Sequence, residues 1–203
     1  MSVIECRELH YGIVDIGSAS LPPGIIAVTG HNGSGKTTFL RLLAGLLQPE
    51  KGEMRIDGHR PEEIHCGFVG DAPDKNLIFG RVESEISSSL WFCHQSADLV
   101  RDYVNNVASE LGITHLLSRN VRELSGGEKV LVALATALVS SPRLLILDES
   151  DAYLDDATAL RVYSCVRSRS VPYVVYTTHL LDSPLLADMC IRFDQGRIAE
   201  AIS

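Results

Sequence analysis

Residues 30–37 read Gly30-His31-Asn32-Gly33-Ser34-Gly35-Lys36-Thr37, between an apolar, β-branched run at 25–29 and an amphipathic run at 36–47. This stretch fits the pattern G-x-x-x-x-G-K-[ST], in which glycines let the backbone turn tightly and point N–H groups at phosphate. A strand before the pattern and a helix after it are the context in which it binds a nucleoside triphosphate. The sequence therefore predicts a phosphate-binding loop within an α/β fold.

The side chains of this loop have separate expected roles. Lys36 would neutralise the β- and γ-phosphates, the Thr37 hydroxyl would be a ligand of Mg²⁺, and Thr38 would hydrogen-bond the α-phosphate. The residues expected to bind ATP are Gly30, His31, Asn32, Gly33, Ser34, Gly35, Lys36, Thr37 and Thr38.

A pair of carboxylates, Asp148 and Glu149, directly follows the apolar run at 144–147. An unbroken apolar run is typical of a strand covered on both faces, and ligands of open α/β sheets bind at the carboxyl ends of such strands. We expect Asp148 to hold Mg²⁺ and Glu149 to polarise the attacking water as a general base. The pair alone is a weak signal, and its combination with the loop at 30–37 supports the assignment.

A second glycine-rich stretch, Leu124-Ser125-Gly126-Gly127-Glu128, precedes a helical run at 127–139. A serine hydroxyl and glycine N–H groups at a helix start form another site for an anion, although the same residues can simply cap the helix. Since one triphosphate rarely needs two such sites, we expect this one to face the γ-phosphate of a nucleotide held by a second chain.

Strand-like and helical runs alternate along most of the chain, which predicts βαβ units and a mainly parallel sheet. The strand-like runs lie at 3–6, 25–29, 53–56, 67–69, 144–147, 173–177 and 189–193, and the helical runs at 36–47, 127–139 and 155–166. The tail at 196–203 is expected to form an edge strand. Residues 82–117 are helical in pattern, with apolar positions at Leu99, Tyr103, Val107 and Leu111. We interpret this region as a helical insertion of about 50 residues.

Composition narrows the classes of function. The net charge of −8 argues against a general basic surface for nucleic acid. The five cysteines are odd in number and form no C-x-x-C pair, so we expect buried thiols rather than zinc ligands or disulfides.

The longest strongly apolar run, 130–139, has ten residues, and the N-terminus lacks a signal-peptide pattern. We therefore expect a soluble chain whose membrane partner is another polypeptide.

Four motifs in this order, GHNGSGKTT, LSGGE, LLILDE and TTH, resemble those of the ABC ATPase family, and the resemblance covers the whole chain. It implies an α/β fold with a P-loop NTPase core, a mainly parallel sheet, an N-terminal antiparallel β portion and a helical subdomain insertion. It implies one domain at 1–203, with the core at 1–70 and 126–203 and the helical subdomain at about 71–125. The implied activity is the hydrolysis of ATP with Mg²⁺.

The resemblance also implies roles for individual residues. In this family the signature motif of one subunit closes over ATP held by another, and the matching residues here are Ser125, Gly126, Gly127 and Glu128. Residues 152–155 match the D-loop, which crosses the seam between two subunits. His179 matches the switch histidine, which contacts the γ-phosphate and helps to position water. Tyr11 matches the aromatic residue that stacks on adenine.

One position departs from the family pattern. The family usually has glutamine after the strand at 67–69, where it is a ligand of Mg²⁺, and this chain has Asp71. A carboxylate also suits Mg²⁺, a hard cation that prefers oxygen. Asp71 is therefore a candidate metal ligand, and the equal alternative is that it caps a turn before Pro73.

Three local features resemble the ATPases of energy-coupling-factor importers, which take up vitamins and transition-metal ions. They are His31 in the loop, Pro73-Asp74 followed by Asn76, and the stretch Val82-Glu-Ser-Glu-Ile86. The match is partial, because that branch usually has Gln-Asn-Pro-Asp. It implies two partners, a second ABC ATPase chain and an integral membrane transporter subunit, the latter expected to bind at 71–92. The chain would then lie in the cytoplasm on the inner face of the cell membrane.

Other members of the family remain as alternatives. The ATPase of the haem exporter of cytochrome c biogenesis and small exporter subunits are also short. ABC ATPases of DNA repair usually contain a long coiled coil, and those of translation carry two such domains, whereas this chain has no sustained heptad run and one domain. We therefore expect no nucleic-acid partner.

Overall fold

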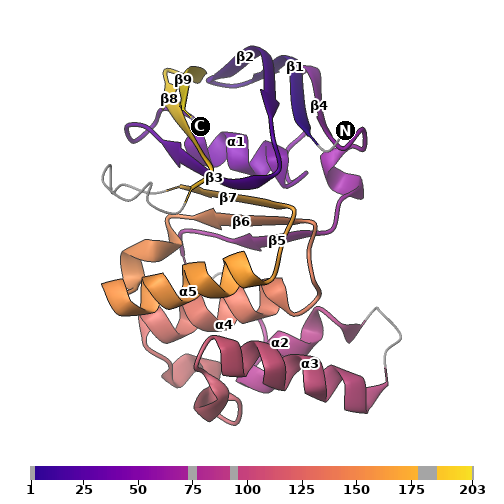
Figure 1. Cartoon of the computed structure of the whole chain (residues 1–203), viewed down its shortest axis with the longest axis vertical. Helices are drawn as coiled ribbons and strands as arrows, with labels where there is room; N and C mark the ends of the chain where they lie inside the picture. The colour runs from indigo at the N-terminus through magenta and orange to yellow at the C-terminus, as the bar shows by residue number, and fades with distance from the viewer. Residues whose placement is uncertain (1–2, 73–76, 92–95, 178–186, 203) are drawn as a thin grey trace. The chain divides into compact units, whose positions relative to one another are not determined.

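The computed structural model describes residues 3–72, 77–91, 96–177 and 187–202, and the chain divides into two compact units. The first unit comprises Met1–Cys66, Arg143–Glu149 and Pro172–Ser203. The second comprises Gly67–Pro142 and Ser150–Val171. Figure 1 shows the elements of each unit with their labels.

The first unit contains a three-stranded antiparallel sheet. Its strands are β1 (Ile4–Tyr11), β2 (Val14–Leu21) and β4 (Lys51–Ile56), in the order β2-β1-β4. β1 and β2 form a hairpin in which Tyr11 pairs with Val14 across a two-residue turn. The sheet confirms the predicted N-terminal antiparallel β portion.

β2 lies outside the predicted strands. Its sequence, VDIGSASL, buries only Val14, Ile16 and Leu21, and its centre is Gly-Ser, which favours strands weakly. The strand forms because it pairs with β1 from Leu21 opposite Ile4 to Val14 opposite Tyr11. Pairing with a neighbour thus outweighs the weak local pattern.

The first unit also contains β3 (Gly24–Thr29), β6 (Leu144–Asp148), β7 (Tyr173–Thr177), β8 (Met189–Asp194) and β9 (Arg197–Ile202), which follow one another in the order β6-β7-β3-β8-β9. β6, β7, β3 and β8 run parallel, and β9 pairs antiparallel with β8. The mainly parallel sheet and the strand at the tail are therefore as predicted. Every residue of β6 is buried, as its unbroken apolar run indicates.

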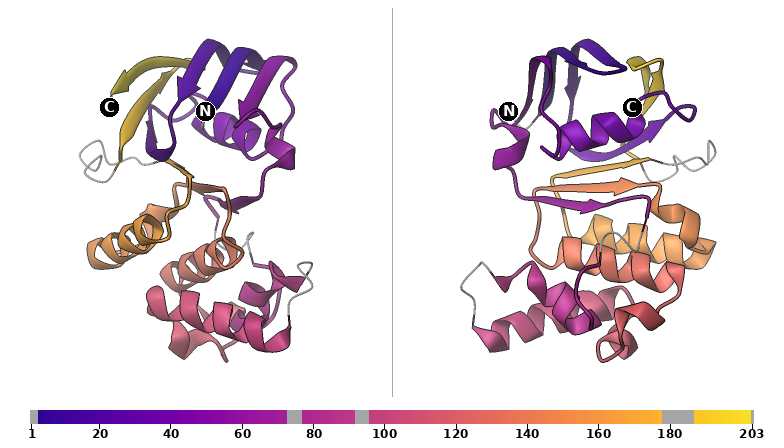
Figure 2. Two further views of the ribbon diagram at one scale, coloured as in Figure 1. Left: turned by 45° about the vertical axis from the view of Figure 1, so that its right-hand side comes forward. Right: turned by 180° about the vertical axis from the view of Figure 1, so that it is seen from behind.

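Helix α1 (Lys36–Leu43) lies between the antiparallel sheet and β3 (Figures 1 and 2). It buries Phe39, Leu40, Leu42 and Leu43, and the Phe39 ring lies 5.0 Å from the ring of Phe193 on β8. The helix ends before residue 47 in a Schellman motif, in which Leu46 N–H bonds the Arg41 carbonyl and Gly45 N–H bonds that of Leu42. A short 3₁₀ turn, η1 (Pro61–Glu63), follows β4.

The second unit is mostly helical. It contains most of β5 (Cys66–Val69), then α2 (Val82–Ser88), α3 (Ala97–Glu110), α4 (Gly126–Leu138) and α5 (Asp156–Ser168), with 3₁₀ turns η4 (Thr114–Leu116), η5 (Val121–Glu123) and η6 (Ser150–Tyr153). α2 and α3 pack against α4, as both views of Figure 2 show. Helices α2 and α3 lie in the region 82–117 that the sequence predicts to be helical, and the division into a core and a helical subdomain at about 71–125 stays a prediction. No helix among the described residues is long and apolar enough to cross a membrane.

The apolar positions predicted for α3 are only partly buried. Val107 and Leu111 are fully buried, whereas Leu99 and Tyr103 are 47% and 42% exposed. The N-terminal half of the apolar stripe therefore remains uncovered in the second unit.

Among the described cysteines, Cys6 and Cys165 are buried, and Cys66 and Cys190 are partly buried. Burial raises the pKa of Cys6 and of Cys66 to about 12. Burial also raises the pKa of Cys165 to about 11, with a contribution from its hydrogen bond to Glu110. These three thiols stay protonated at neutral pH and are poor nucleophiles.

Asp57 connects the ends of three strands in the first unit. Its carboxylate accepts hydrogen bonds from the Val3 N–H at 2.8 Å, the Tyr173 hydroxyl at 2.6 Å and the Arg143 Nε at 2.8 Å. Burial by itself raises the pKa of this carboxyl. The hydrogen bonds from Tyr173, Arg143 and Val3, together with the charge of Arg143, outweigh that effect and hold the pKa below its ordinary value.

We predict that Asp57→Asn lowers the free energy of unfolding by about 1–3 kcal/mol at pH 7, because it removes charge-assisted bonds to a partly buried carboxylate. A carboxyl with a lowered pKa in the folded state stabilises the fold above its unfolded pKa, and this stabilisation is lost as the pH falls through the folded pKa. The difference between wild type and variant should therefore shrink below about pH 4. Urea unfolding of wild type and variant at pH 7 and below about pH 4 measures this difference in stability. Asp15→Asn, at an exposed carboxylate paired with Arg197, is the control and should change stability little.

Candidate active site

The predicted phosphate loop connects the buried strand β3 to helix α1, as the sequence indicates. The Lys36 side chain is only 5% exposed, and its Nζ donates hydrogen bonds to the carbonyls of Gly30 at 2.8 Å and His31 at 3.2 Å. The loop is therefore wrapped around the ammonium group. This places a positive charge where the loop backbone turns, as phosphate binding requires.

Ser34 in the same loop has a hydroxyl that suits a ligand. Its Oγ is buried and has no hydrogen-bond partner among the described residues. A buried hydroxyl without a partner is costly in a folded protein and points to a group that binds there. A phosphate oxygen next to the loop would supply that partner.

The loop opens into a cavity of about 450 Å³. The cavity is lined by Ile13, Asn32, Gly33, Gly35, Lys36, Thr37, Thr38 and Glu149. The fold thus brings most of the predicted phosphate-binding residues together with the predicted general base, from segments far apart in the sequence. Another cavity, of about 300 Å³ next to Leu42 and Met54, is lined by none of the predicted site residues.

A threonine on the neighbouring strand bonds both acidic residues at the end of β6, the carboxylate of Asp148 and the backbone of Glu149. Thr177 Oγ1 donates to Asp148 Oδ1 at 2.7 Å and accepts from the Glu149 N–H at 2.8 Å. Asp148 and Thr177 are 2% and 1% exposed, and Glu149 has a left-handed backbone with φ of 52°. The Thr177 hydroxyl therefore fixes both the carboxylate of Asp148 and the unusual backbone of Glu149.

The motif TTH contains Thr177, but nothing in the local pattern of that motif assigns it this role. The strand register does, because residue 177 lies opposite residue 148 in the parallel pair of β6 and β7. A hydroxyl residue at the end of one strand beside the acidic end of its neighbour is the signal that could have revealed it.

The donors predicted for Mg²⁺ are the hydroxyl of Thr37 and the carboxylate of Asp148, both in the first unit. Hydroxyl and carboxylate oxygens fit Mg²⁺, which is commonly held by one or two protein groups and by phosphates of the substrate. The third predicted ligand, Asp71, lies in the second unit, where it is exposed just after β5. Its role as a ligand stays a prediction.

The signature stretch begins α4 with a capping box. Ser125 Oγ accepts the Glu128 N–H at 3.3 Å, and the Glu128 carboxylate accepts the Ser125 N–H at 2.7 Å. These bonds to Ser125, helped by the charges of Arg119 and His115, hold the pKa of Glu128 below its ordinary value. The capping role that the sequence left open is therefore present. Binding of an anion from a partner stays a prediction.

The two glycines of the signature are packed against the D-loop of the same unit. A Cβ on Gly126 would lie 3.2 Å from the Tyr153 ring, and one on Gly127 would lie 2.9 Å from the Tyr153 carbonyl oxygen. Any larger residue at 127 would push against the backbone. The match of residues 152–155 to a D-loop thus coincides with close packing on the signature.

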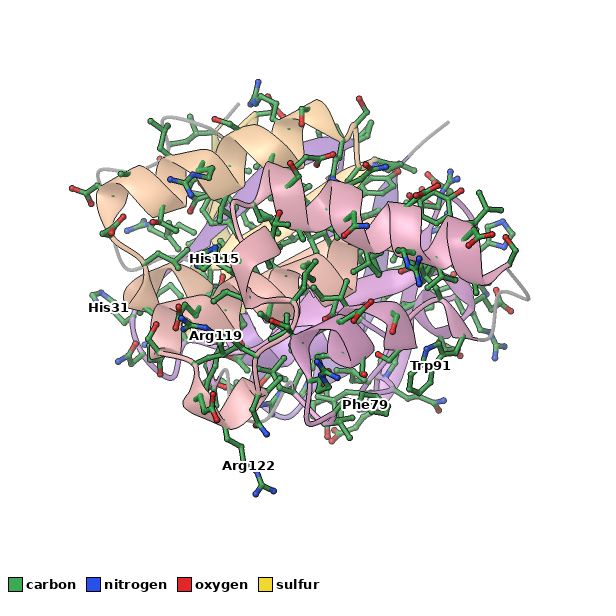
Figure 3. The ribbon with its side chains drawn as sticks, turned by 90° about the horizontal axis from the view of Figure 1, so that it is seen from below. His31, Phe79, Trp91, His115, Arg119 and Arg122 are labelled. Carbon is green, nitrogen blue, oxygen red and sulfur yellow. The ribbon has the colours of Figure 1, made fainter. Side chains whose placement is uncertain are left out.

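Three other predicted residues lie away from the cavity or outside the described chain. Tyr11 ends β1 and does not line the cavity, whereas Ile13, two residues later, does. The side chain of His31 is exposed (Figure 3), and its carbonyl is the group that bonds Lys36. His179 lies outside the described residues.

Comparison with known proteins identifies similar sequences. The family model described as ABC transporter matches residues 18–152. The energy-coupling factor transporter ATP-binding protein EcfA1 of Mycoplasmopsis synoviae is 33% identical over 186 residues, which cover 87% of this chain and 70% of the relative. The protein of the same name from Ligilactobacillus salivarius is 33% identical over 189 residues, covering 86% of this chain and 66% of the relative.

Comparison with solved structures identifies proteins of similar fold. The structure of cbiO1 from Clostridium perfringens, described as part of the ABC transporter complex cbiONQ, matches with a TM-score of 0.87 and 25% identity, over 98% of this chain and 88% of that one. A dimeric ATP-binding cassette bound to ADP and phosphate matches with a TM-score of 0.86 and 20% identity, over 98% of both chains. The second likeness concerns the fold alone.

We predict that Thr177→Val lowers the turnover of ATP by roughly tenfold to a hundredfold, because losing a group that orients active-site ligands typically costs that much. Affinity for ATP should change much less, since the loop around Lys36 is untouched. Thr177→Ser keeps the hydroxyl and should retain most of the turnover. Steady-state phosphate release measures both variants, and a fully active valine variant would contradict the role given to Thr177.

Proposed function

Because the chain belongs to the ABC transporter family, we propose that it is the ATP-hydrolysing subunit of an importer of the energy-coupling-factor type, working as a dimer with Mg·ATP on a membrane subunit. The observation that carries this proposal is the single cavity in which the loop around Lys36 meets Glu149. The similarity to EcfA1 proteins and to cbiO1 supports the type of importer. We propose a vitamin or a transition-metal ion as the cargo class.

The hydrolysis follows from the groups in the cavity. Lys36 neutralises the β- and γ-phosphates, and Ser34 offers its unpartnered hydroxyl to a phosphate oxygen. Glu149 accepts a proton from water as the water oxygen bonds the γ-phosphorus. The bond from the γ-phosphorus to the bridging oxygen breaks, leaving ADP and phosphate. Mg²⁺, held by Thr37 and Asp148, would supply further charge neutralisation on the phosphates.

The signature stretch supports a second chain as partner. Ser125 and Gly126 are exposed at the N-terminus of α4, where a helix favours an anion. Basic side chains gather near this helix start: Arg119 lies 3.9 Å from Glu128, and Figure 3 shows Arg122 extending away from the ribbon. We propose that this surface receives the γ-phosphate of ATP bound by the partner chain.

An apolar surface in the second unit supports the membrane subunit as the other partner. It consists of Ile78, which is 84% exposed, Trp91, which is 51% exposed, and Phe79, whose ring meets that of Trp91 edge-on at 4.7 Å (Figure 3). The buried Glu85 carboxylate accepts the N–H groups of Ile78 at 2.8 Å and Phe79 at 2.6 Å. Exposed apolar side chains held in a fixed backbone suit a permanent partner.

We predict that Glu149→Gln still binds ATP, forms the dimer in its presence and loses at least about 99% of its turnover, because a general base contributes about a hundredfold or more.

Lys36→Ala should weaken nucleotide binding by roughly tenfold or more, because it removes a charge-assisted contact. Calorimetry, sedimentation and phosphate release test these outcomes. Full turnover of the glutamine variant, or unchanged affinity of the alanine variant, would remove the corresponding residue from its role.

The type of transporter is tested by tagging the chain in its native cell, solubilising the membranes gently and identifying the proteins that co-purify. Small integral membrane proteins of the energy-coupling-factor kind support the proposal and name the cargo. Recovery of a single conventional permease or of a haem exporter would show that the chain drives another type of transporter. Soluble nucleic-acid machinery without a membrane protein would overturn the transport function.

We predict that Ile78→Asp reduces the recovery of the membrane subunit by about tenfold, because it places a charge in an apolar contact. ATP binding should be unaffected. The matched control is Leu160→Asp on α5, which changes another exposed aliphatic residue of the same unit, 60% exposed. Equal loss for both variants would show that the surface around Ile78 is not the specific contact.

A further inference from the structure

The phosphate loop carries an Asn-Gly pair, Asn32-Gly33, at the tip of a tight turn. The Ser34 N–H donates to the His31 carbonyl at 3.1 Å and closes a four-residue turn in which the pair holds both central positions. Gly33 has φ of 78°, a left-handed backbone that glycine adopts without strain. Both residues are exposed and line the cavity that contains Lys36. The pair therefore lies open to solvent where phosphate is expected to bind.

The backbone nitrogen of Gly33 is accessible to the side chain that precedes it. No backbone carbonyl among the described residues accepts the Gly33 N–H, and a Cβ built on Gly33 would meet no atom of a non-neighbouring residue within 4 Å. Just after the pair the loop is anchored, because the Ser34 carbonyl accepts the Gly196 N–H at 2.8 Å. The pair thus combines an N–H without a described backbone partner, open space and an adjacent side-chain amide. These are the conditions under which asparagine cyclises.

We propose that Asn32-Gly33 is a deamidation site, at which the nucleotide-free protein loses its phosphate site through a reaction of its own backbone. The Gly33 nitrogen attacks the Cγ of Asn32 and forms a new N–C bond, and the side-chain nitrogen leaves as ammonia with the proton from Gly33. A cyclic imide results, and water opens it at either of its C–N bonds. Opening at Cγ gives aspartate, and opening at the main-chain carbonyl gives isoaspartate, whose backbone runs through the side chain.

Either product changes the part of the loop that is expected to hold phosphate. Aspartate places a negative charge beside the phosphates, which repels another anion. Isoaspartate has the same charge and also adds one carbon to the backbone of the turn. The N–H groups of Gly33 and Ser34 then no longer converge on one phosphate oxygen, as an anion-binding nest requires. We therefore expect isoaspartate to be the more damaging product.

Bound nucleotide competes with this reaction for the same N–H. This step rests on the proposed function, since it takes the cavity to be the nucleotide site. A phosphate oxygen that accepts the Gly33 N–H occupies the nitrogen that must attack and holds the turn closed. Asn32 is therefore protected while nucleotide is bound and reacts while the site is empty.

The test incubates the whole chain at mildly alkaline pH with and without Mg·ATP, the latter kept at about a hundred times its Kd. Peptide mapping by mass spectrometry follows the mass gained when –NH₂ becomes –OH, and chromatography separates isoaspartate from aspartate. We expect Asn32 to convert in the empty protein in step with the loss of ATP affinity, and at least about tenfold more slowly with Mg·ATP.

The same digest contains internal controls. Asn105 and Asn106 lie within α3, and Asn120 uses its side chain to accept the Arg122 N–H at 2.9 Å. The residue after each of them carries a side chain, which hinders the approach of its nitrogen to Cγ. These asparagines should stay unmodified while Asn32 converts.

Two variants separate the parts of the proposal. Asn32→Gln has a longer side chain that forms the ring far less readily, so it should keep its own initial ATP affinity throughout the incubation. Asn32→Asp carries the charge without the added backbone carbon, and it should bind ATP roughly threefold to tenfold more weakly than fresh wild type. The isoaspartate form, isolated from aged wild type, should bind more weakly than Asn32→Asp.

Two results would overturn the modification site: an Asn32 that stays intact in the empty protein, or full conversion that leaves ATP affinity unchanged. Equally fast conversion with and without Mg·ATP, in a protein shown to bind it, would overturn the competition. If fresh wild type does not bind ATP, the proposed function fails, whereas conversion of Asn32 in that protein would still support the modification site.

Discussion

The site depends on one buried charge, the ammonium of Lys36. A buried charge is tolerated only when it is paired or hydrogen-bonded, and the loop meets this need with the carbonyls of Gly30 and His31. In the same loop the Ser34 hydroxyl lies in a buried position with no partner among the described residues. The loop therefore folds around its own lysine. A phosphate oxygen of a nucleotide would supply the hydrogen-bond partner that the Ser34 hydroxyl lacks among the described residues.

The remaining site residues lie at the ends of neighbouring parallel strands. β3 leads into the loop, β6 ends at Asp148, and β7 lies between them and ends at Thr177. One threonine hydroxyl can therefore bond both the carboxylate of Asp148 and the backbone N–H of Glu149. The signature stretch belongs to the other compact unit of the chain and is capped by its own Glu128. Each unit thus carries one of the two stretches that we propose to contact phosphate.

Sequence reasoning succeeded where local chemistry decides the structure. Glycine spacing and the lysine identify the phosphate loop, an unbroken apolar run identifies β6, and a Ser-x-x-Glu pattern begins α4. It missed β2, Thr177 and Ile13, because each is placed by contacts with another segment of the chain and not by its own local pattern. It also extended α1 to residue 47, since Leu46 and Leu47 continue the apolar pattern beyond the Gly45 turn that ends the helix. Asp71 and His179 carry roles implied by resemblance that the described structure does not test.

The contact between Gly196 and Ser34 has a consequence for the newly synthesised chain. β3 and the phosphate loop emerge from the ribosome well before β7 and β8, the two strands that flank β3 in the sheet. Contacts of such large sequence separation form late in folding. The nascent chain therefore carries the phosphate motif before the sheet that holds it can form, and the nucleotide site is assembled only after β7 and β8 have been made.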